Sequence, residues 1–356
     1  MSAEVAARPD ASPQRAGLPG AAAAVRRSVR RRARAVVVAA IVALLVVSAL
    51  ALMTGDYPLD IGQVWRTVLG GGERVEQYVV LQVRAPRLAM AIVVGGCLGI
   101  AGALLQGLLR NPLASPDLLG ISGGSSVAAV FLTVILGVSG APLAIGACAG
   151  GMIVAALLLL AGRRGADGGY RLILAGIGIT FLCASVTSYL LASGKVELAQ
   201  AALIWITGTL SASSWTQVLI VGAVLVVTLP AVIAAARWLP LTQLGPQTAA
   251  GLGVRPDRVR WVVVVAAVVL TSVTTAFAGP IAFVALCAPA IARPLLGHGA
   301  VGVATSALLG ATMLASADLV AQFAVPGLSF PVGIVTGALG AVFLLCILAT
   351  SKGRQL

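Results

Sequence analysis

Long apolar stretches follow one another along most of the chain, separated by short links rich in Gly, Pro and charged residues. The pattern predicts ten apolar spans, at residues 35–53, 87–109, 118–139, 141–162, 171–193, 216–236, 260–279, 281–297, 300–317 and 331–350. Each span is close to the roughly 20 residues that an α-helix needs to cross the hydrocarbon core. A β-barrel would show shorter segments of alternating polarity, and the run VVVVAAVVL (262–270) does not alternate. We therefore expect an all-α membrane protein, a polytopic bundle of about ten transmembrane helices over residues 35–350.

The composition agrees with a lipid environment. Hydrophobic residues make up 59% of the chain and charged residues 10%, against about 45–50% and about 25% in soluble domains. The five cysteines lie in apolar stretches without CxxC spacing, which indicates small buried side chains. With His298 as the single histidine, we expect neither a metal site nor a bound cofactor.

The positive charge is concentrated on one side of the predicted membrane. If the N-terminus is cytoplasmic, the inner segments carry 19 Lys and Arg residues and the outer segments carry 5. By the positive-inside rule, both termini are expected in the cytoplasm. Residues 1–34 are expected to form a disordered, Arg-rich cytoplasmic tail, and residues 351–356 a short cytoplasmic C-terminal tail. RNA binding by the first tail is the weaker alternative, because this tail has no aromatic side chain on which bases could stack.

Two links are unusually long. Residues 54–86 are expected to form an outer loop that ends in RAPR (84–87). Residues 237–260 are expected to form an inner link, whose apolar residues have helical spacing at Leu241, Leu244, Ala249 and Leu252. This spacing predicts one or two short helices at the cytoplasmic surface. We favour contact with a protein partner over a helix that lies on the lipid surface, because the segment has few basic residues on its polar face.

The stretch VVGGCLGIAGALLQG (93–107) places small residues at three- and four-residue spacing, which predicts close helix packing. In the next link, RNPLASPDLLGISGG (110–124), Pro112 and Pro116 are expected to stop the helix and Asp117 to cap the following one. Asn111 and Asp117 are thus interpreted as structural. The chain has no GxxxxGK[ST] motif, so it is not expected to bind ATP through a P-loop.

Four stretches, in order, resemble the FecCD-type permeases of bacterial ABC importers for iron-siderophores, haem and vitamin B12. They are RAPRLAMAIVVGGCLGIAGALLQGLLRNPLASPDLLGISGGSS (84–126), LTQLGPQTAAGLGV (241–254), AGPIAFVALCAPAIARPLLG (278–297) and ADLVAQFAVPGLSFPVGIVTGALGAVFLL (317–345). The resemblance covers about residues 36–350. It implies a type II ABC importer permease fold with ten helices per subunit, paired with a second permease subunit. It also implies two ABC ATPase subunits on the cytoplasmic face and an extracytoplasmic siderophore-binding protein on the outer face.

The same resemblance implies residue roles. Arg84 and Arg87 match arginines that dock the binding protein through charge-assisted pairs, and Gln322 stands where the family has a third outward arginine. The alternative for both arginines is snorkelling at a helix end. By having Gln322 at this position, the chain resembles the second subunit of ferric-enterobactin-type permeases. A family histidine is replaced at Ala290, which puts any role of that position in doubt.

Two further sets of residues complete the candidate sites. ATPase coupling is expected at Leu244, Gly245, Ala249, Ala250, Leu252 and Gly253. Candidates for lining the transport pathway are Gln106, Ser122 and Ser125, together with the stretch TGTLSASS (207–214), in which Thr207 and Ser211 are singled out.

The resemblance favours a ferric-siderophore permease in the bacterial cytoplasmic membrane, without enzymatic activity of its own. Haem or cobalamin import is the alternative within the family. A stand-alone channel or secondary transporter would need buried acids or histidines along the spans, and only Asp318 comes close. An intramembrane enzyme would need a nucleophile with a base or a metal cluster, and the sequence offers neither.

Overall fold

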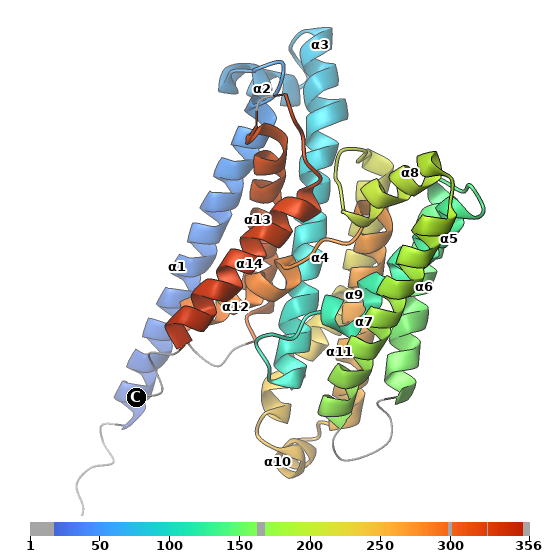
Figure 1. Cartoon of the computed structure of the whole chain (residues 1–356). Helices are drawn as coiled ribbons and strands as arrows, with labels where there is room; N and C mark the ends of the chain where they lie inside the picture. Colours follow the sequence, from blue (N-terminus) through green and yellow to red (C-terminus); the bar gives the residue numbers. More distant parts are fainter. Residues whose placement is uncertain (1–17, 162–167, 298–300, 326, 352–356) are drawn as a thin grey trace, which may run out of the picture.

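The computed structural model describes residues 18–161, 168–297, 301–325 and 327–351, which form a bundle of helices (Figure 1). The helices are α1 Leu18–Met53, α2 Ile61–Val68, α3 Arg74–Gln77, α4 Ala85–Leu109, α5 Ile121–Val134, α6 Ala141–Ala161, α7 Gly168–Ser193, α8 Val196–Ile206, α9 Trp215–Thr242, α10 Pro246–Gly251, α11 Pro256–Ala278, α12 Val284–Leu296, α13 Val303–Phe323 and α14 Val332–Ser351. Short π- and 3₁₀-helices cover Tyr78–Arg84 and Asp117–Leu119.

Each predicted apolar span coincides with a helix, but the helices differ in length. Within the described ranges, seven helical segments are long and apolar enough to cross a membrane. The helices α5 and α12, with 14 and 13 residues, are shorter than the usual span. Helix α8 is an additional apolar helix that the sequence pattern did not predict. A multi-pass helical bundle is therefore confirmed, whereas the number of crossings is not fixed at ten.

Helix α4 lies at the centre of the bundle, in contact with α9, α11, α12 and α13 (Figure 1). Its small residues allow these contacts, as predicted. A Cβ on Gly99 would collide with the carbonyl oxygen of Ser306 on α13, and one on Gly102 with the carbonyl oxygen of Ala285 on α12. Pro289 lacks the N–H that would normally bond to the Ala285 carbonyl, so that carbonyl is free to face α4.

The expectation of a disordered tail over residues 1–34 is corrected for its second half. Helix α1 begins at Leu18 and continues without a break into the apolar span. Ala and Arg are strong helix formers, and extending an existing helix avoids the cost of nucleation. The Arg32 guanidinium also donates from Nε to the Leu295 carbonyl (2.8 Å) and from an Nη to the Pro294 carbonyl (3.0 Å), which caps the end of α12. Residues 1–17, His298 and residues 352–356 lie outside the described residues.

The outer link 54–86 is largely helical rather than a loop. Helix α3, the π-helix and α4 form one continuous helix over Arg74–Leu109. The π-helix ends at Arg84, two residues before Pro86, whose missing N–H interrupts the regular hydrogen bonding of the helix. Arg84 therefore lies within a helix and not at the end of a loop.

The inner link 237–260 was predicted to hold one or two short helices, and it contains one, α10. The first residues of the link prolong α9 to Thr242, and its last residues belong to α11, which begins at Pro256. Gly253, with φ +79°, ends α10 in a Schellman motif: its N–H bonds to the Ala250 carbonyl (2.9 Å), and the Val254 N–H bonds to the Ala249 carbonyl (2.9 Å).

Candidate functional site

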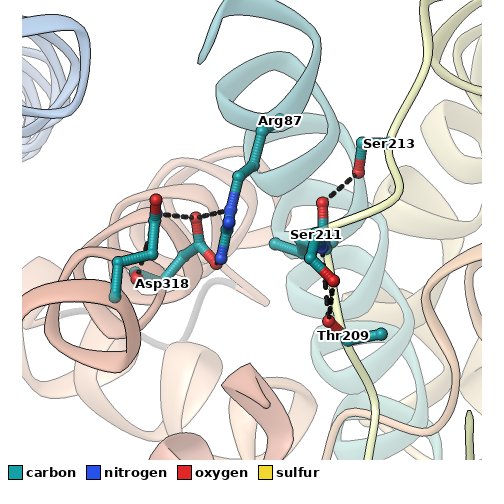
Figure 2. Close-up of polar contacts among 7 residues, drawn as sticks. Arg87, Thr209, Ser211, Ser213 and Asp318 are labelled. Atoms are coloured by element: carbon teal, nitrogen blue, oxygen red, sulfur yellow. Dashed lines mark hydrogen bonds and ion pairs between the residues drawn. The ribbon is translucent and has the colours of Figure 1, made fainter. Parts of the chain in front are cut away.

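A buried ion pair gathers two of the predicted docking residues. Arg87 on α4 donates from Nε and from an Nη to the two carboxylate oxygens of Asp318 on α13, both at 2.8 Å (Figure 2). Gln322, one turn further along α13, donates from Nε2 to Asp318 Oδ2 (2.8 Å). The Asp318 side chain is 7% exposed and that of Arg87 20%. The bidentate pair offsets the charge of a carboxylate that would be costly to bury alone.

Arg84 does not join this group. Its guanidinium donates to the carbonyl oxygens of Leu52 (2.7 Å), Met53 (3.3 Å) and Tyr57 (2.6 Å). The first two belong to the last turn of α1, where carbonyls have no partner within the helix. Arg84 thus fixes the C-terminal end of α1, a role that the motif RAPR did not reveal. The side chain keeps partial exposure, and its docking role stays a prediction.

The semi-polar link between α8 and α9 lies beside a cavity of about 450 Å³ lined by Trp205, Thr209, Ser213, Gln217 and Phe277, among others. Backbone bonds hold this link in place: the Thr209 N–H donates to the Ala278 carbonyl (2.8 Å), and the Gly333 N–H to the Gly208 carbonyl (3.1 Å). Thr209 and Ser211 bond through their hydroxyls at 2.8 Å (Figure 2). The sequence singled out the stretch 207–214, which includes Thr209 and Ser213, but it missed Trp205 on α8, because no local pattern shows which face of this helix lines a cavity.

Three of the predicted pathway residues have other surroundings. Gln106 is fully buried and donates from Nε2 to the Leu286 carbonyl on α12 (3.0 Å). Ser125 is also fully buried, against Gly151 on α6. Ser122, 8% exposed, donates from its hydroxyl to Asp117 (2.5 Å). Helices enclose Gln106 and Ser125, so neither lines an open surface in this conformation, and their pathway role stays a prediction. Ser211 is exposed and Thr207 partly exposed.

The predicted coupling residues divide into an exposed and a buried set. Leu244 and Leu252 are 60% and 57% exposed at the two ends of α10, and Ala250 and Gly253 are also exposed. Ala249 is fully buried, so it packs α10 against the rest of the chain. Gly245, with φ +104°, has open space around its Cα, so it serves the turn and not a close approach.

A hollow of about 300 Å³ lies beside the exit of α10 and was not anticipated. Trp238, Gly253, Val254, Arg255 and Arg258 are among the residues that line it. The two arginines are exposed and give this side of the inner link a positive charge. Such a hollow fits an acidic group on a protein partner.

The link between α4 and α5 has the structural role expected of it, with one difference. Asn111 Oδ1 accepts from the Leu113 N–H (2.9 Å), and an Arg110 Nη donates to the Thr242 carbonyl (2.9 Å), which ties α4 to the end of α9. Asp117 does not cap α5: the N-cap is Gly120, and Asp117 instead accepts the Ser122 hydroxyl. Burial raises the pKa of the Asp117 carboxyl, and the Ser122 hydrogen bond opposes that rise.

Comparisons with known proteins agree with this architecture. The ferric enterobactin transport system permease protein FepG of Escherichia coli is 36% identical over 319 residues, which cover 88% of this chain and 96% of FepG. The Fe(3+)-citrate import system permease protein YfmE of Bacillus subtilis is 36% identical, with 88% and 94% covered. The vitamin B12 import system permease protein BtuC of Vibrio cholerae is 35% identical, with 81% and 88% covered.

A solved structure has the same fold. It shows an inward-facing conformation of a metal-chelate type ABC transporter and matches with a TM-score of 0.79 and 26% identity, covering 88% of this chain and 98% of that one. The model of the FecCD transport family matches residues 43–350. The chain therefore belongs to the FecCD transport family of ABC importer permeases.

Proposed function

We propose that this chain is the transmembrane permease subunit of an ATP-driven importer that takes up ferric siderophores across the bacterial cytoplasmic membrane. The observation that carries the proposal is its similarity, over nearly the whole chain, to permeases named for ferric enterobactin and Fe(3+)-citrate. Cobalamin is the second candidate substrate, because a vitamin B12 permease is nearly as similar.

The partners follow from the two ends of the molecule. On the cytoplasmic side, two ABC ATPase subunits hydrolyse ATP, and one of them receives Leu244 and Leu252 of this chain. These large apolar side chains are exposed at a helical turn that glycines shape. The hollow with Arg255 and Arg258 would take an acidic group of the same ATPase.

On the outer side, a siderophore-binding protein docks near Arg84, Arg87 and Gln322. Arg87 and Gln322 bond to Asp318, and Arg84 bonds to the end of α1. The contact would use what these bonds leave, namely the remaining N–H groups of the two arginines and the Oε1 acceptor of Gln322, whose two amide hydrogens are both donated to Asp318. A second permease subunit, identical or paralogous, completes the pathway. Phe181 and Tyr189 on α7, which are 71% and 72% exposed, are candidates for the contact with this second subunit.

The orientation proposed has both termini in the cytoplasm. It is supported by the bias of 19 basic residues against 5 between the two sets of links. It places α10 on the side of the ATPase, and the Arg87–Asp318 pair on the side of the binding protein.

Uptake of labelled substrates tests the proposal. A strain that lacks this subunit would be given ferric hydroxamate, ferric catecholate, ferric citrate, haem and cobalamin, with the intact gene restored as the control. We expect loss of uptake of one ferric siderophore and its recovery on complementation. Loss of cobalamin or haem uptake alone would keep the family and overturn the substrate, and loss of none would overturn the proposed substrate classes together.

A further inference from the structure

Four arginines near the start of α1 lie on one face of the helix. Arg27, Arg30, Arg31 and Arg34 are all exposed, and their spacing of three, four and seven residues places them on one stripe. No acidic residue occurs between Asp10 and Asp56, so no neighbour along this helix neutralises them. This is a concentrated positive surface on an ordered helix.

The rotation of α1 is fixed, which decides where the stripe points. Arg32 extends to the opposite side, where it bonds to the carbonyls of Pro294 and Leu295 at the end of α12. Further along, Ala40 is buried and Val47 packs on the main core. These contacts turn the four-arginine stripe away from the protein.

The stripe continues the exposed apolar face of the same helix. Val38, Ile41, Val42 and Leu45 are 58%, 41%, 53% and 63% exposed. At 100° per residue they follow directly on from Arg27, Arg31 and Arg34, along one side of a helix that runs at the edge of the bundle (Figure 1). In a membrane protein, an exposed apolar face of this kind faces lipid tails. The arginines on the same face then stand at the level of the headgroups, since residues 31 and 34 lie within about 6 Å of the first apolar turn at 1.5 Å per residue.

We propose that the stripe of Arg27, Arg30, Arg31 and Arg34 binds the phosphate groups of anionic phospholipids in the cytoplasmic leaflet. This rests on the proposed cytoplasmic position of the N-terminus, and it goes beyond topology, because the positive-inside rule counts charges and does not require them on one face. Guanidinium groups bind phosphate through paired hydrogen bonds, and a juxtamembrane cluster of this size attracts anionic lipid. The bound headgroups would hold the inner end of α1 and, through Arg32, the end of α12.

The test compares lipid preference among variants of the full chain in nanodiscs. Each nanodisc contains phosphatidylglycerol and phosphatidylcholine, and native mass spectrometry counts the lipids retained after a detergent wash. Both faces of a nanodisc are accessible, so the result does not depend on the orientation of the chain. For the wild type we expect retained phosphatidylglycerol, with a preference that falls as salt rises. In R27Q/R30Q/R31Q/R34Q the preference should fall about tenfold or more.

Two control variants separate the stripe from general charge and from folding. The variant R27K/R30K/R31K/R34K keeps the charge and should keep most of the preference. Arg32→Gln removes one arginine from the opposite face, and it should leave the preference unchanged while lowering the unfolding temperature, since α12 loses its cap.

Equal phosphatidylglycerol retention in the wild type and the four-Gln variant would overturn the proposal. So would a loss in Arg32→Gln as large as in the four-Gln variant. If the four-Gln variant kept its lipids but no longer co-purified with the ATPase, the stripe would belong to a protein contact, and the lipid proposal would be wrong.

Discussion

The two proposed ends of this permease differ in how their candidate contact residues are held. The polar side chains at the outer end are bonded within the chain, whereas the apolar side chains at the inner end are exposed. At the outer end, Arg84, Arg87 and Gln322 spend their hydrogen bonds within the chain, on α1 and on Asp318. At the inner end, Leu244 and Leu252 are exposed, and what the chain fixes there is the backbone, through the turns at Gly245 and Gly253. Substitution of a motif residue that is bonded within the chain lowers the stability of the fold, and this loss can be mistaken for loss of a functional contact. Substitution of an exposed side chain on a fixed backbone changes the stability little.

The largest expected effect is on the outer ion pair. Arg87→Ala leaves the nearly buried carboxylate of Asp318 without its cation and should lower the free energy of unfolding by about 3–5 kcal/mol. Thermal unfolding of the purified subunit in nanodiscs measures the loss.

The double variant R87M/D318L serves as the matched control, because it removes both charges together and should recover most of the stability. The same variant separates a docking role of Arg87 from its structural role. If this folded variant no longer binds the siderophore-binding protein, Arg87 has a docking role in addition to its structural one. If Arg87→Ala proves as stable as the wild type, the pair is not what holds α4 to α13 at this end.

Arg84→Gln should have the next largest effect. The substitution removes charged donors from three carbonyls, two of them in the last turn of α1, at an expected loss of about 1–3 kcal/mol in unfolding free energy. The exposed Arg74 provides a matched outer arginine, and Arg74→Gln should cost less than about 0.5 kcal/mol. A normal unfolding temperature together with weakened capture of the binding protein would instead assign Arg84 to docking alone.

The inner end should respond in function and not in stability. Leu252→Asp places a charge where an apolar contact with the ATPase is proposed, and we expect about a tenfold or greater loss of transport-coupled ATP hydrolysis. The unfolding temperature should stay near that of the wild type because Leu252 is 57% exposed. Leu69→Asp, at a leucine that is 70% exposed on the proposed outer side, is the control and should leave ATP hydrolysis unchanged. An unaltered hydrolysis rate in Leu252→Asp would remove α10 from the ATPase interface.

Much of the fold could be predicted because hydropathy and charge act locally along the chain. Apolar runs gave the helices, and the small residues at 93–107 gave the close packing of α4 on α12 and α13. The failures have a different origin. The links of Arg84 to Leu52, of Arg32 to Leu295 and of Arg87 to Asp318 join residues distant in sequence, and no local pattern records them. Gln106 resembled a pathway residue because it is polar inside a span, yet its partner is a carbonyl on α12, which only the packing of the two helices reveals.

The smallest effect is expected at the inner link between α4 and α5, and it carries a pH signature. Because burial raises the pKa of Asp117, the folded state favours the protonated acid, and its charged form at neutral pH lowers stability. Asp117→Asn stays neutral and can still accept the Ser122 hydroxyl, so it should gain stability at pH 7, by less than about 1 kcal/mol. As pH falls through the raised pKa, the wild type becomes protonated and the gain should disappear. Unfolding temperatures of both proteins between pH 7 and pH 4 measure this convergence.

Asp257→Asn is the control, in the exposed first turn of α11. It should be slightly destabilising instead, because it loses a favourable interaction with the helix dipole. If the gain in Asp117→Asn persisted unchanged into acid, the Asp117 carboxyl would titrate as an ordinary hydrated group. This link would then resemble the exposed surface around α10 more than the nearly buried group of Arg87, Asp318 and Gln322.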